Sequence, residues 1–108
     1  MAEITLTGHE PHDIDLPEAA RLTANYRRTV PEDAKKGGYF GEDAILELLA
    51  QKDCIGFRYY YGLDDDGKQV LVLVGVKPDG NDIIDGRILE RSWPCPNICS
   101  GSNVLNSD

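Results

Sequence analysis

The sequence is short of basic residues and has no long hydrophobic run. Its 108 residues include 11 Lys and Arg against 19 Asp and Glu, a formal net charge of −8. A chain this acidic has no basic footprint for phosphate contacts, so we expect no nucleic acid and no anionic membrane surface as a partner. No apolar run approaches the roughly 20 residues that a helix needs to cross a bilayer.

Cysteine and histidine are also scarce. The three cysteines, an odd number, are too few for the disulfide framework of a small secreted domain. Residues 1–9 have neither the positively charged segment nor the apolar segment of a secretory signal. We therefore expect a cytoplasmic protein whose thiols are reduced.

The length fits one domain with a modest core. Helical patterns come first and strand patterns follow, which favours an α+β fold over alternating βαβ units. We predict two helices packed on a three-stranded antiparallel meander within a single domain, residues 1–108. An extended N-terminal arm covers residues 1–14, the α+β core covers 15–90, and a tail containing Pro and Cys covers 91–108.

Capping signals place both helices. Asp15, Pro17 and Glu18 form the N-terminal signature of a helix that we expect over residues 16–28. After the break at Gly37 and Gly38, a second helix is predicted over residues 42–51, with Ile45, Leu48 and Leu49 toward the core.

From Cys54 the hydrophobic period changes to two, which is typical of strands. Turn signals at residues 64–67 and 78–81 separate this first strand from a second over residues 68–77 and a third, more polar one over residues 82–90. The pattern predicts a hairpin that continues into a meander.

The middle strand is apolar on both faces, and two short helices can cover only one of them. Either the two ends of the chain cover the second face, or another chain does. Tyr and Arg are common at the centres of interfaces. Our leading hypothesis is a non-enzymatic module that binds itself or another protein, and we expect a homo-oligomer. The predicted contact residues are Arg58, Tyr60, Val70, Val72, Val74 and Val76.

A second hypothesis rests on the Cys-x3-Cys tail. Cys95 and Cys99 could hold a metal, form a disulfide or act as a redox pair. With His9 and His12 they make a Cys2His2 zinc site stoichiometrically possible, although the spacing is not the Cys-x2-Cys of zinc knuckles. A Pro-fixed tail with idle cysteines is the simpler interpretation, and we expect no cofactor.

Two other candidate sites have simple structural interpretations. The acidic residues at 64–66 and 79–85 do not fit the EF-hand spacing, and turn chemistry accounts for them. Cys54 would need a neighbouring base to act as a nucleophile, and at the start of a strand it is better read as a small buried side chain. The sequence favours a protein that is not an enzyme.

Several segments together resemble a family of small bacterial proteins of unknown function. They include FGEDAI at residues 40–45, CIGFRYYYGLD at 54–64, LVGV at 73–76 and PCPNIC at 94–99. The similarity follows the order of the chain over most of its length. The resemblance implies no substrate, cofactor or catalytic residue, but it makes the Cys-x3-Cys tail part of the family's sequence pattern.

Overall fold

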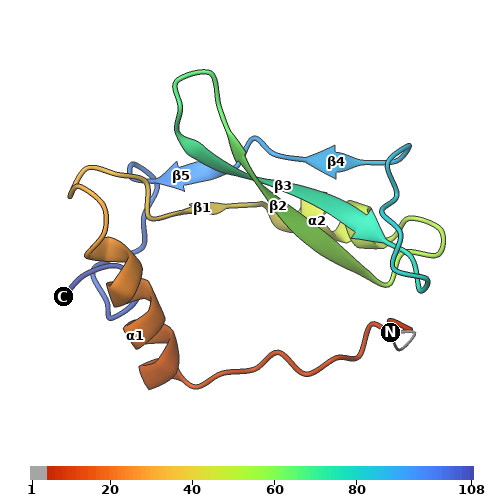
Figure 1. The fold of residues 1–108 in the computed structure, drawn as a ribbon, viewed down its shortest axis with the longest axis horizontal. Helices are drawn as coiled ribbons and strands as arrows, with labels where there is room; N and C mark the ends of the chain where they lie inside the picture. The colour runs from red at the N-terminus through yellow and green to blue at the C-terminus, as the bar shows by residue number, and fades with distance from the viewer. Residues whose placement is uncertain (1–4) are drawn as a thin grey trace. The chain divides into compact units, whose positions relative to one another are not determined.

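The computed structural model describes residues 5–108, which divide into two compact units (Figure 1). The first unit contains residues 5–10 and 40–92, and the second contains residues 11–39 and 93–108. Within residues 5–108, neither helix has the length and apolar character that a membrane span requires.

The first unit holds helix α2, Glu42–Leu49, and the strands β2, Gly56–Leu63, β3, Gln69–Val76, and β4, Ile88–Leu89. The strands form an antiparallel sheet in the order β2-β3-β4. The predicted α+β class and the three-stranded meander are therefore confirmed.

The hairpin between β2 and β3 follows the predicted turn chemistry. The Asp64 side chain accepts hydrogen bonds from the backbone N–H groups of Asp66 and Lys68, both at 2.9 Å. Gly67 takes a φ of 78°, a conformation that disfavours any residue with a side chain. The Asp64 carboxylate therefore has a structural role in this turn.

The third strand is much shorter than the predicted 82–90. Asp82 makes only an isolated bridge to Val76, and regular pairing resumes at β4, where Ile88 faces Val74. Between them the chain turns, with the Gly86 N–H bonded to the Ile83 carbonyl. The Arg87 N–H donates a hydrogen bond to the side-chain oxygen of Gln51, at 2.8 Å. This N–H group therefore cannot bond a neighbouring strand.

Helix α2 ends against one face of this sheet. Gln51, two residues beyond the helix, donates to the Leu48 carbonyl at 2.9 Å. A Cβ at Gly75 would lie 2.9 Å from the Gln51 amide nitrogen and 2.9 Å from the Cys54 sulfur, so this strand position has no room for a side chain. The buried apolar residues of the core are Leu48, Leu73, Val74, Val76 and Ile83.

The second unit contains helix α1, Leu16–Arg27, and the short strands β1, Gly37–Tyr39, and β5, Trp93–Cys95. Asp15 caps the helix as predicted, because its side chain accepts from the Glu18 N–H at 2.9 Å. The Glu18 carboxylate pairs with Arg21 instead of closing the capping box. The sheet-packing helix of the first unit is thus α2, while α1 belongs to the second unit.

Strands β1 and β5 form a two-stranded antiparallel sheet that the sequence did not reveal. Gly37 and Gly38 indicate only a helix break in the sequence, and Pro94 and Pro96 only a fixed tail. The Lys36 N–H donates to the Cys95 carbonyl at 2.6 Å, and the rings of Tyr39 and Trp93 lie 6.1 Å apart. Three-residue strands are too short to show a period of two.

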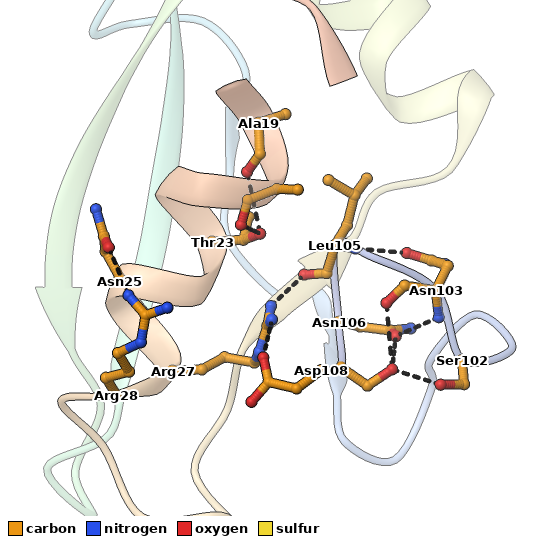
Figure 2. Close-up of polar contacts among 12 residues, drawn as sticks. Ala19, Thr23, Asn25, Arg27, Arg28, Ser102, Asn103, Leu105, Asn106 and Asp108 are labelled. Carbon is orange, nitrogen blue, oxygen red and sulfur yellow. Dashed lines mark hydrogen bonds and ion pairs between the residues drawn. The ribbon is translucent and has the colours of Figure 1, made fainter. Parts of the chain in front are cut away.

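The C-terminal segment is held to α1 by one arginine (Figure 2). Arg27 donates to the Leu105 carbonyl and to the Asp108 carboxylate, both at 2.9 Å, and its side chain is only 11% exposed. Asn103 organises the turn beyond it by donating to Gly101 and accepting from Leu105 and Ser107. This tail is therefore folded by its own polar side chains.

Candidate binding surface

The register of β2 and β3 defines two faces of the sheet in the first unit. Arg58 faces Val74 and Tyr60 faces Val72, which puts both polar side chains on the same face as the valines, as predicted. We call this the front face. The opposite face, which carries Phe57, Tyr59 and Tyr61, is the back face.

Polar side chains close over part of the front face. Arg58 and Tyr60 extend from β2, and both bond the carboxylate of Asp82, which pairs with Val76 on the far side of β3. Arg58 also donates to the Gly80 carbonyl at 3.1 Å. Because β3 lies between β2 and Asp82, these contacts pass over the valines of β3.

The electrostatics of this cluster are mutually stabilising. The Tyr60 hydroxyl and the Arg58 guanidinium, which donate to the Asp82 carboxylate, lower its pKa. The same hydrogen bond raises the pKa of Tyr60, since ionisation would remove the donated proton.

The front face is consequently less open than the sequence indicated. Val74 and Val76 are buried, at 3% and 4% exposed, within the isolated chain, while Val70 and Val72 are half-buried. Both valines lie on the face that the contacts from Arg58 and Tyr60 to Asp82 cross. Of the predicted contact residues, Tyr60 is still 48% exposed.

The back face carries the larger exposed apolar surface. Phe57, Tyr59, Tyr61 and Leu63 alternate along β2 and are 45, 54, 71 and 74% exposed. The rings of Tyr59 and Tyr61 meet edge to face, with centroids 5.6 Å apart. We name these four residues the β2 stripe. Helix α2 ends near Gly75 and leaves the stripe exposed, although we expected helices to cover this face.

The stripe also lies on an open sheet edge. In the order β2-β3-β4, β2 has β3 on one side and no strand on the other among residues 5–108. The Asp64 N–H donates to the Lys68 carbonyl at 2.9 Å in register with this ladder. In an antiparallel ladder, hydrogen-bonded residue pairs alternate with pairs that are not hydrogen-bonded. Because Asp64 bonds β3, the even-numbered residues of β2 do the same, and the odd-numbered residues turn their N–H and C=O groups toward the open edge.

The same four residues therefore offer two kinds of contact. Among residues 5–108, the odd-numbered positions of β2 have backbone groups with no partner at the edge and apolar side chains on the back face. The sequence signal for this was the alternation from Ile55 to Tyr61, but the sequence does not say which strand becomes the edge.

The second predicted site is a disulfide. Cys95 and Cys99 are bonded to each other, with Cα atoms 4.8 Å apart. Sulfurs bonded in this way are not thiolate ligands for zinc. His9 is exposed in the first unit and His12 is exposed in the second, and residues 5–108 contain no group of three or more His, Cys, Asp and Glu able to hold a metal. The pair has the disulfide form that the sequence left open as an alternative, in place of the idle thiols of the simpler interpretation.

The remaining cysteine lies at the start of the first-unit sheet. Cys54 is half-buried, and its thiol donates to the Gly56 carbonyl at 3.2 Å. Its sulfur fills the space beside Gly75. This placement agrees with a packing role for the side chain.

Comparison with known proteins adds no relative. No protein-family model, curated protein or solved structure matches the chain. The resemblance to the small bacterial family stays a prediction, and the function has to be argued from the surface itself.

Proposed function

We propose that this protein is a non-enzymatic binding module whose first unit accepts a further polypeptide strand along β2. The observation that carries the proposal is the coincidence, on the same four residues, of open backbone groups and the apolar β2 stripe. Strand addition draws affinity from main-chain hydrogen bonds and specificity from alternate side chains, and β2 offers both.

The composition of β2 supports this use of the edge. Sheet proteins commonly protect an edge strand with charges, proline, a bulge or extreme shortness. This strand is eight residues long, has no proline, and its one charged residue, Arg58, is engaged by Asp82. The edge lacks the usual features that prevent pairing.

A labelled model peptide tests the proposal. The probe is an eight-residue peptide of alternating Tyr and Thr with blocked ends, measured by fluorescence anisotropy at a low concentration of the full chain. We expect saturable binding, and at least tenfold weaker binding of the same peptide with two alternate residues replaced by proline, which cannot donate.

Matched variants locate the binding surface. Tyr59→Lys with Tyr61→Lys should abolish peptide binding, whereas Ile84→Lys, at an equally exposed apolar position of the same unit, should not. Equal binding of the peptide to both variants would reject strand addition at β2.

The disulfide favours a thiol site as a second candidate function. Closing Cys95 and Cys99 releases two electrons and two protons to a disulfide or comparable oxidant, and reduction reverses this. Thiol titration under a graded glutathione buffer tests the idea. A pair that stays oxidised throughout a cytosolic range of potentials is structural and removes this candidate.

A further inference from the structure

We propose that the strand accepted by β2 is β2 of a second copy of this chain, paired antiparallel about a two-fold axis at Tyr60. This inference rests on the proposed function and adds to it the identity of the occupant and the register. Three features of β2 support it: an edge with no neighbouring strand among residues 5–108, the side chains that would oppose each other across that edge, and the exposed apolar area of the β2 stripe.

Symmetry restricts the pairing. An antiparallel pair of identical strands side by side has its two-fold axis perpendicular to the sheet, so the back faces of the two copies are continuous. Residues opposite each other must then both be odd-numbered or both be even-numbered. The outward backbone groups of the odd-numbered residues are the ones that can bond across the axis.

The side chains select one register. With the axis at Tyr60, Tyr59 faces Tyr61 of the second copy and Phe57 faces its Leu63, so every residue of the β2 stripe gains an apolar partner. Arg58 then faces Gly62, which leaves room for its ion pair with Asp82.

Neighbouring registers oppose less favourable side chains across the axis. An axis at Arg58 would oppose two guanidinium groups, which is destabilising. An axis at Tyr59 would move Leu63 beyond the end of the opposing strand.

The available area fits a weak dimer. Side chains of this size have about 200 Å² each, so the exposed fractions of the stripe correspond to at most roughly 490 Å² per copy, or roughly 980 Å² for the pair. Specific interfaces begin near 1,000 Å², and the backbone bonds along the edge add to the apolar contact. We therefore expect association that depends on concentration over a range from about 1 µM to about 1 mM.

Cysteine trapping tests the register. In the Cys54→Ala background, Tyr60→Cys places two identical thiols opposite each other across the axis, where non-bonded antiparallel pairs have Cα atoms about 4.5 Å apart, within reach of a disulfide. We expect mild oxidation to give a covalent dimer. Leu63→Cys is the matched control, because Leu63 is more exposed than Tyr60, at 74% against 48%, yet faces residue 57 of the other copy.

The outcomes separate this inference from the proposed function. Cross-linking of Tyr60→Cys at least tenfold faster than Leu63→Cys or Tyr59→Cys supports the register, and equal or reversed rates overturn it.

Sedimentation of the unmodified chain gives a second measurement, which does not depend on the folding of a variant. A strict monomer at about 1 mM that still binds the model peptide overturns self-pairing and leaves the proposed function standing. A dimer unaffected by Tyr59→Lys with Tyr61→Lys, in a chain that does not bind the peptide, overturns both.

Discussion

Asp82 links two polar side chains on the front face of the sheet. It accepts hydrogen bonds from Arg58 and Tyr60 across β3, whose Val74 and Val76 are buried on the same face. The more exposed apolar residues of the sheet are those of the β2 stripe, on the back face.

The pH dependence of stability should report on Asp82. Its folded-state pKa is below the ordinary value of 3.8, so its contribution is present above that value and is lost as the pH falls through the folded pKa. We expect urea unfolding from pH 7 to pH 2 to show this loss in the natural chain. In Asp82→Asn, the part of this loss of unfolding free energy at low pH that comes from Asp82 should be missing. Because Glu10, Asp79 and Asp108 also have lowered pKa values, the difference between the two chains is the quantity to compare.

Arg27 should control the order of the C-terminal turn. Arg27→Gln removes the bonds to Leu105 and Asp108, and hydrogen bonds to charged groups contribute about 1.5–3 kcal/mol, or roughly tenfold or more in a local equilibrium. Amide hydrogen exchange of Asn106 and Ser107 should accelerate by at least about tenfold. Arg28→Gln removes a bond to Asn25 and a weaker electrostatic attraction to Asp108, but no hydrogen bond to the C-terminal turn, so its effect should be much smaller. Equal acceleration in both variants would contradict the role of Arg27.

At the scale of elements, glycine in β3 reflects close packing by the segment that follows α2. Gly75→Ala introduces a Cβ 2.9 Å from both the Gln51 amide and the Cys54 sulfur. Overpacking of this kind lowers the free energy of unfolding by about 1–3 kcal/mol. Chemical denaturation measures it. Gly56→Ala is the control, since a Cβ there meets no atom within 4 Å, and a comparable loss in both variants would argue against the packing explanation.

The disulfide closes a short loop and should therefore stabilise the second unit to a limited extent. Cys95 and Cys99 close a loop with a separation of four residues, for which the chain-entropy relation gives about 2 kcal/mol. Reduction should lower the free energy of unfolding by about this amount. Hydrogen exchange should accelerate at the Lys36 amide, which bonds Cys95, more than at amides of β2 and β3. Unchanged protection at Lys36 after reduction would contradict this expectation.

For the whole molecule, net charge opposes the proposed dimer. Each copy carries a formal charge of −8, so two copies repel at low ionic strength while the apolar contact of the β2 stripe is little affected by screening. We expect the dissociation constant to fall several-fold between about 50 mM and about 500 mM salt, measured by sedimentation equilibrium. Weaker association at high salt would point to an interface held by ion pairs and not by this stripe.

The sequence by itself determined the local structure. The Asp15 cap, the turn at Asp64 and Gly67, the alternation in β2 and β3 and the extent of both helices depend on residues close together in the chain, and all were predictable from it. The bond between Cys95 and Cys99 joins residues four apart and was one of several alternatives that the sequence left open. Only the tertiary structure shows the pairing of β1 with β5 and the contacts of Asp82 with Arg58 and Tyr60, because these bring together residues far apart in the chain, whose approach depends on the path between them.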